Sequence, residues 1–287
     1  MRRSFLIALL FSLSVAPASA DVSLPVVLGS GMVLQRDLPV PVWGWADPGE
    51  EVTVSFAGQT KTARADDQGR WAVKLGALKA SREGRSLKVK GSNEISLDDV
   101  LVGEVWICSG QSNMEWPISR SMRPTEEAAA ADYPAIRLFN VPGHTTSPLP
   151  QEKGRGSWQV CSPGTVKSFS AVGYFFGRRL WKEMQVPIGL VGSNWGGTRI
   201  EPWATLAGFE SVKELADLAN RVRSYRKNTK VGGGHPSAIY NSMVHPLTPF
   251  AMRGAIWYQG ESNGSEGRSY YHKKHALVNG WRKAFQN

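Results

Sequence analysis

The sequence lacks any hydrophobic run long enough to cross a bilayer as a helix. Its longest apolar stretch, Phe5 to Ala16, is shorter than the roughly 20 residues that a transmembrane helix requires. Two arginines precede this stretch and the small residues Ala18-Ser19-Ala20 follow it, which is the order of a secretory signal peptide. We therefore expect residues 1–20 to be a signal peptide cleaved near Ala20, and the mature chain to be secreted or periplasmic.

Cysteines and metal-binding motifs are also scarce. Cys108 and Cys161 are the only cysteines, too few for a domain held together by disulfides. In an oxidising compartment they form either one bridge or two buried thiols. No His-x-x-x-His or Cys-x-x-Cys pair occurs, so the sequence contains no motif for a metal ion.

Long runs of one charge are absent as well. Without residues 1–20 the chain has 32 basic and 24 acidic residues, a net charge of +8, and the basic residues are dispersed. A nucleic-acid-binding arm would concentrate them, so we expect no nucleic-acid partner, and we expect no membrane partner either. The remaining composition, 41% hydrophobic and 20% charged residues, is that of a globular protein.

Residues 21–98 show the alternation of short β-strands. Val52, Val54 and Phe56 share one face of an extended segment, and the same alternation recurs over 71–75 and 87–90. Turn residues separate these segments at 47–49, 57–58, 66–69 and 91–93. The spacing predicts a small N-terminal β-sandwich domain.

From residue 99 to 287 strands alternate with helices. An apolar segment, Val100 to Cys108, is typical of a buried parallel strand. Further strands are expected at 136–141, 187–191 and 255–258, and helices at 125–131, after Ser168 or Ser170, at 210–224 and at the end of the chain. This alternation predicts an α/β domain in which helices flank both faces of a parallel sheet.

Three of these strands end in polar, glycine-containing loops at 108–116, 192–198 and 258–263. Ligands of open α/β sheets bind beyond the carboxyl ends of the strands, so we expect the three loops to form one site. Ser112 follows the first strand, where a serine is either a nucleophile or the cap of the next helix. Its surroundings are not the Gly-x-Ser-x-Gly turn of α/β-hydrolases, because Met114 occupies the last position.

The other two loops supply groups that suit a developing negative charge. Gly196 and Gly197 allow the backbone to approach a ligand and offer N–H groups, although an ordinary tight turn has the same composition. Gln259 and Asn263 are neutral amide donors on either side of Glu261. They are expected either to complete an oxyanion hole or to hold a substrate.

Three separated blocks carry a family resemblance. They are Asp99 to Trp116 (DVLVGEVWICSGQSNMEW), Ile188 to Trp203 (IGLVGSNWGGTRIEPW) and Gly254 to Asn263 (GAIWYQGESN). In this order they closely resemble the sialate O-acetylesterases of the SGNH hydrolase superfamily. The resemblance implies an SGNH-like α/β fold and a serine esterase that removes O-acetyl groups from sialic acid or related sugars, with neither a metal nor an organic cofactor.

The same resemblance implies roles for individual residues. Ser112 corresponds to the nucleophile, and the oxyanion hole is implied to comprise Gly197 or Gly196 together with Gln259. The acetylated sugar is expected to contact Asn113, Arg199, Glu261 and Asn263. For Arg199 and Glu261 the alternative is a structural pair.

The family's catalytic base and its orienting acid lie in an Asp-x-x-His-Pro block that this sequence lacks. None of the five histidines has an aspartate three residues before it. We therefore expect the α/β domain to be incomplete at its C-terminus and the chain to be a weak catalyst, because nucleophile and base act as a unit. The alternatives are an impaired fragment, a non-catalytic carbohydrate-binding protein, or an esterase for acetylxylan-type polysaccharides.

Overall fold

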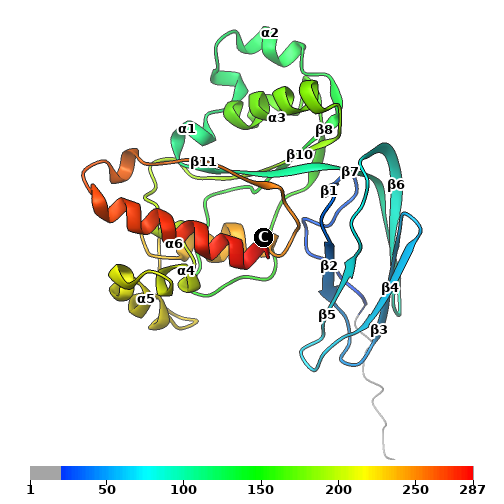
Figure 1. The fold of residues 1–287 in the computed structure, drawn as a ribbon, viewed down its shortest axis with the longest axis horizontal. Coiled ribbons are helices and arrows are strands. Elements are labelled where there is room, and N and C mark those ends of the chain that lie inside the picture. Colours follow the sequence, from blue (N-terminus) through cyan, green and yellow to red (C-terminus); the bar gives the residue numbers. More distant parts are fainter. Residues whose placement is uncertain (1–20, 287) are drawn as a thin grey trace, which may run out of the picture.

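The N-terminal part is a β-sandwich in the computed structural model, which describes residues 21–286 (Figure 1). The predicted signal peptide lies outside the described residues. One sheet is the antiparallel pair β2 (Val40–Trp45) and β5 (Arg70–Leu75). The other contains β4 (Gln59–Arg64), β3 (Glu51–Phe56), β6 (Ser81–Lys90) and the first part of β7 (Glu94–Gly110). Alternate side chains of β3, of β5 and of the end of β6 are buried between the sheets, as the sequence predicts, whereas β4 has no buried side chain.

One strand, β7, connects the two parts of the molecule. Its first half pairs antiparallel with β6, and its second half pairs in parallel with β1 (Val33–Gln35), β10 (Ile188–Asn194) and β11 (Gly254–Tyr258). At the change of partners Asp99 has a φ of 55°, and its carboxylate accepts a hydrogen bond from Arg137 at 2.7 Å. The boundary expected between residues 98 and 99 therefore falls inside one strand rather than in a linker.

The rest of the chain forms an α/β unit. Its parallel strands are ordered β11, β7, β10 and β8 (Tyr133–Asn140), and β9 (Trp158–Cys161) is antiparallel to β8. The helices are α1 (Ser112–Glu115), α2 (Pro124–Ala129), α3 (Ala171–Met184), α4 (Leu206–Glu210), α5 (Ala216–Arg223) and α6 (Arg268–Phe285). Figure 1 shows α1, α2 and α3 on one face of the sheet and α4, α5 and α6 on the other. The predicted parallel sheet with helices on both faces is confirmed.

Some local predictions differ from the structure. The helix expected at 210–224 is shorter in the structure: α4 ends at Glu210, Val212 is extended, a 3-10 turn follows at Lys213–Leu215, and only then does α5 begin at Ala216. Ser170, one of the two predicted caps, does cap α3 by accepting the Gly173 N–H at 3.0 Å. Further 3-10 or π turns lie at Ile118–Arg120, Val166–Ser168, Glu201–Trp203, Tyr240–Val244, His245–Leu247 and Glu261–Asn263. Within residues 21–286 no helix is long and apolar enough to span a membrane.

The register of the parallel strands brings their C-terminal ends level. Gly110, the last residue of β7, lies opposite Asn194 at the end of β10 and opposite Tyr258 at the end of β11. A Cβ atom on Gly110, whose φ is 147°, would lie 2.0 Å from the carbonyl oxygen of Tyr258. Only glycine permits this close approach of the backbones. The three predicted loops therefore leave the sheet at one edge.

Candidate active site

Ser112 is the first residue of α1, directly beyond the end of β7. The N-cap position belongs to Gln111, so Ser112 is not the helix cap that one interpretation expected. The Ser112 side chain is exposed, and its hydroxyl has no hydrogen-bond partner within residues 21–286. Because α1 has only four residues, its dipole is small, and neighbouring N–H groups must provide most of the stabilisation of a negative charge.

Hydrogen bonds hold the loop of Ser112 against the loop after β11. The buried side chain of Gln111 accepts the N–H groups of Gly260 at 3.4 Å and Ser262 at 3.3 Å. Asn113 donates to the Glu261 carboxylate at 2.6 Å. Asn113 and Glu261, both predicted to contact the sugar, are therefore paired with each other in this structure.

The loop after β10 approaches Ser112 through Gly196. A Cβ atom on Gly196 would lie 3.5 Å from both Cα and Cβ of Ser112. The Gly196 N–H donates to Glu115 Oε2 at 2.6 Å and is therefore not free for an oxyanion. Gly197 has a φ of 73° and open space around its Cβ position, and its N–H has no partner among the described residues. Of the two predicted glycine donors, only Gly197 has a free N–H group.

Gln259 is buried, and its side chain is fully engaged within the protein. Its amide nitrogen donates to the Thr198 carbonyl at 3.1 Å and to Asn263 Oδ1 at 2.8 Å, and its amide oxygen accepts the Tyr270 hydroxyl at 3.1 Å. A buried amide left unpaired would cost free energy, so the fold satisfies it. The structure thus differs from the expected oxyanion role, because Gln259 has no free donor.

Arg199 belongs to a charged network behind the loops. It forms ion pairs with Glu266 and, at 3.5 Å, with Glu201. The buried Lys273 donates to the same two carboxylates at 2.5 Å and 2.7 Å. Burial opposes ionisation of Glu201, but hydrogen bonds from Lys273, the backbone and Asn263 outweigh it and lower the pKa of Glu201. The structure therefore supports the structural alternative for Arg199.

Two further residues, Glu115 and His144, connect the helix of Ser112 with the loop after β10. His144 Nε2 is 2.6 Å from Glu115 Oε1, and the His144 ring stacks on Trp195 with centroids 4.7 Å apart and planes 6° apart. The one signal available for Glu115 was its position three residues after Ser112, on the same side of a helical turn. His144 has no comparable signal, because its loop reaches the site only through the fold.

No histidine forms a hydrogen bond with the Ser112 hydroxyl within residues 21–286. His245 and His235 are bonded to the backbone of other loops, and His272 lies 3.8 Å from Glu214. His144 directs Nε2 at Glu115, so its other ring nitrogen points away from that carboxylate. In this part of the chain, therefore, no histidine is hydrogen-bonded to Ser112 as a general base would be.

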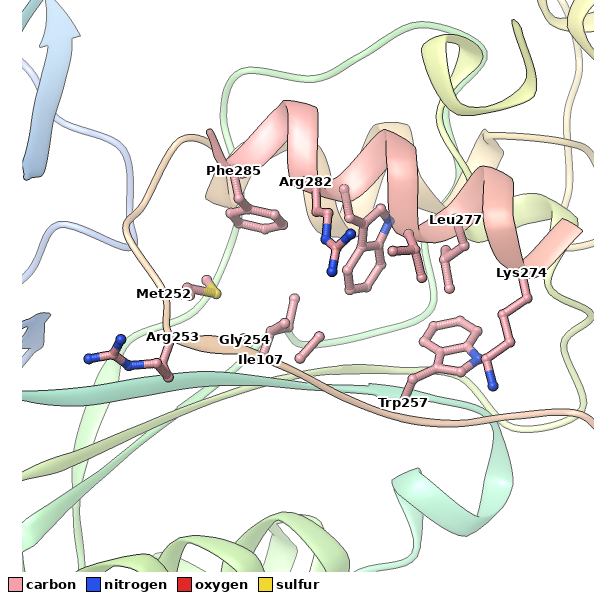
Figure 2. Close-up of a pocket in the computed structure, with 12 residues that line it drawn as sticks. Ile107, Met252, Arg253, Gly254, Trp257, Lys274, Leu277, Arg282 and Phe285 are labelled. Carbon is pink, nitrogen blue, oxygen red and sulfur yellow. The ribbon is translucent and has the colours of Figure 1, made fainter. Parts of the chain in front are cut away.

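A separate cavity of about 450 Å³ lies between β11 and α6 (Figure 2). In Figure 2 the aromatic side chains of Trp257 and Phe285 project into it, and Arg253, Lys274 and Arg282 lie around it. None of the predicted site residues lines this cavity, so it is distinct from the site at the strand ends. No group of three or more potential metal ligands occurs in the part of the chain that the structure describes.

The α/β architecture matches that of a known carbohydrate acetylesterase. Residues 102–287 match the family model described as "Carbohydrate esterase, sialic acid-specific acetylesterase". The chain therefore belongs to this family, also known as the sialate O-acetylesterases.

Known relatives agree with this assignment. The sialate O-acetylesterase of Homo sapiens is 31% identical, covering 90% of this chain and 52% of its own length, and that of Mus musculus is 31% identical, covering 88% and 54%. The crystal structure of a carbohydrate acetylesterase from Xanthomonas citri superposes with a TM-score of 0.80 at 38% identity, covering 93% of this chain and 58% of its own. The chain spans about half the length of the curated relatives it matches.

Proposed function

We propose that this chain carries the nucleophile and the oxyanion-binding loop of a serine esterase that removes O-acetyl groups from sugars, with sialic acid as the first candidate substrate. The observation that carries the proposal is the exposed, unpartnered Ser112 hydroxyl beside the Gly196-Gly197 loop, in which the Gly197 N–H is free. Family membership supports an acetyl ester as the substrate. The names of the curated relatives support sialic acid as the sugar.

In this mechanism the Ser112 oxygen attacks the acetyl carbonyl carbon, and the negative charge on the carbonyl oxygen is stabilised by the N–H groups of Gly197 and Ser112. The bond between the acyl carbon and the sugar oxygen then breaks, and the sugar leaves as a hydroxyl by taking up the proton that came from Ser112. Water next hydrolyses the acetyl ester on Ser112, which releases acetate and restores the serine hydroxyl. The serine proton must pass to a base. Because no described histidine is hydrogen-bonded to Ser112, we expect proton transfer to limit the rate of this chain.

The test is hydrolysis of 4-nitrophenyl acetate by residues 21–287, with and without added imidazole as an external base. We expect slow turnover that imidazole accelerates in the wild-type chain, and no enzyme-dependent acceleration in Ser112→Ala. Ser119→Ala, in the exposed turn after α1, is the matched control. Equal rates for wild type and Ser112→Ala, with imidazole present, would contradict the proposal.

The substrate class is tested separately with O-acetylated sialic acid and acetylated xylan. Preferential release of acetate from sialic acid supports the first candidate, and preferential release from xylan supports the polysaccharide alternative. Binding of acetylated sialic acid without hydrolysis, under any concentration of imidazole, would instead identify a carbohydrate-binding protein.

We also propose that the chain is exported, on the order of charged start, apolar run and small-residue site in residues 1–20. N-terminal sequencing of exported material should begin at or within two residues of Asp21. Soluble cytoplasmic protein with an intact Met1 would contradict export.

A further inference from the structure

Glu115 joins the helix of Ser112 to the glycine loop that faces it. One carboxylate oxygen accepts the Gly196 N–H and the other meets His144 Nε2, both at 2.6 Å. These are short hydrogen bonds to a charged acceptor, which are stronger than bonds between neutral groups. His144 is held in turn by stacking on Trp195, the residue before Gly196. The carboxylate thus binds to the loop directly and also through His144.

We propose that Glu115 is a positioning residue for the oxyanion hole. This inference rests on the proposed esterase function, in which the Gly197 N–H stabilises the oxyanion. Glu115 acts through Gly196 and does not touch the substrate. It fixes the distance between the nucleophile and the donor that follows Gly196 in the chain.

The glycine pair explains why the loop needs the hydrogen bond from the Gly196 N–H to Glu115, which we call the tether. Glycine has more backbone conformations than any other residue, so a Gly-Gly segment by itself does not hold an N–H group in one direction. Oxyanion stabilisation depends on donors that are oriented before the reaction, and an error of about 1 Å is enough to cost roughly 100-fold in rate. With the Gly196 N–H fixed on α1, the peptide between Gly196 and Gly197 is restrained close to Ser112.

The opposite role, a gate, makes the opposite prediction. The Glu115 carboxylate accepts the Gly196 N–H, so this N–H cannot donate to the oxyanion, and the carboxylate's negative charge lies near the oxyanion and repels it. If that effect dominated, removal of Glu115 would raise the rate. The sign of the change in rate therefore distinguishes a positioning residue from a gate.

The experiment compares Glu115→Ala and Glu115→Gln with the wild-type chain. Glutamine keeps an oxygen for the Gly196 N–H and an amide that can meet His144, whereas alanine removes both contacts. We expect Glu115→Ala to lower kcat for 4-nitrophenyl acetate about 10- to 100-fold with KM changed less than about threefold, and Glu115→Gln to stay within about threefold of wild type. His144→Phe retains an aromatic ring that can stack on Trp195 but loses the hydrogen bond to Glu115, so its kcat should lie between those of Glu115→Ala and Glu115→Gln.

Glu126→Ala on the exposed face of α2 is the matched control, and it should match the wild type in kcat and KM. Thermal melting of every variant reports loss of folding. Amide hydrogen exchange of Gly196, followed by NMR, reports the tether itself: it should accelerate in Glu115→Ala and stay slow in Glu115→Gln.

Each outcome decides the inference. A higher kcat in Glu115→Ala identifies a gate, and a lower kcat without faster Gly196 exchange, or without rescue by glutamine, overturns positioning. If the wild-type chain does not hydrolyse the ester even with imidazole, the proposed function fails. The rate of Ser112 labelling by a fluorophosphonate then replaces kcat, and labelling of Glu115→Ala at the wild-type rate would overturn the inference.

Discussion

Replacement of Glu104 by glutamine should weaken the junction between the β-sandwich and the parallel sheet. Glu104 lies in β7 and is 2% exposed. Its carboxylate accepts hydrogen bonds from Arg36 at 2.6 Å and from Arg253 at 2.8 and 3.2 Å. Arg36 follows β1 and Arg253 precedes β11, so one buried charge binds to segments of both parts of the molecule.

The size of the loss follows from the burial of the three side chains. Breaking a fully buried ion pair costs about 3–5 kcal/mol, but the Arg36 and Arg253 side chains retain 23% and 37% exposure and are partly solvated after the change. We therefore expect a loss of about 2–3 kcal/mol in the free energy of unfolding, or about 4–12 °C in Tm. Glu51→Gln breaks the exposed Glu51–Arg64 pair and is the matched control, with a loss below about 1 kcal/mol.

The loss should also depend on pH. Burial opposes ionisation of Glu104, but the bonds from Arg253 and Arg36 outweigh it and hold the pKa of Glu104 below its usual 4.5. A carboxylate with a lowered pKa stabilises the fold above the unfolded-state pKa, and this contribution disappears as the pH falls through the folded-state pKa. Urea unfolding followed by tryptophan fluorescence should thus show the full difference at about pH 7 and a smaller one at about pH 4. An equal difference at both values, or one no larger than that of Glu51→Gln, would refute this reasoning.

Two substitutions and one chemical test examine other buried contacts. Gly110→Ala should destabilise the fold by about 2–4 kcal/mol in urea unfolding, because the new methyl group meets the Tyr258 carbonyl, whereas Gly58→Ala, with open space around its Cβ position, should cost about 1 kcal/mol. Lys273→Met should cost about 3 kcal/mol at neutral pH by thermal melting, because it removes the buried cation between two carboxylates, and an unchanged Tm would contradict this role. Cys108 and Cys161 are free and buried, and burial raises the pKa of Cys161 to about 12. The native protein should therefore react slowly with a thiol reagent, and unfolding it in the absence of reductant should expose two reactive thiols.

Local patterns were sufficient for much of the fold. Alternating burial in β3 and β5 follows directly from alternating apolar residues, and the apolar run at 100–108 is the central part of β7. The three polar loops were located because glycine and polar residues directly follow apolar strands. Their meeting at one edge was predicted because the carboxyl ends of parallel strands lie at the same side of a sheet.

The contacts that individual side chains make could be learned only from the tertiary structure. Glu115 and His144 are 29 residues apart in the chain, and their hydrogen bond exists because the loop after β8 turns over α1. Gln259 and Arg199 were reasonable ligands by residue type, yet the Thr198 carbonyl, 61 residues from Gln259, accepts its amide, and Glu266, far along the chain from Arg199, pairs with its guanidinium. Likewise, β7 runs through the expected domain boundary because pairing partners on both sides keep it extended. Sequence alone determined which segments form strands and which loops carry polar groups, since these depend on residues near in the chain. Only the tertiary structure decided which polar groups remain free for a substrate, since that depends on which distant residues become neighbours.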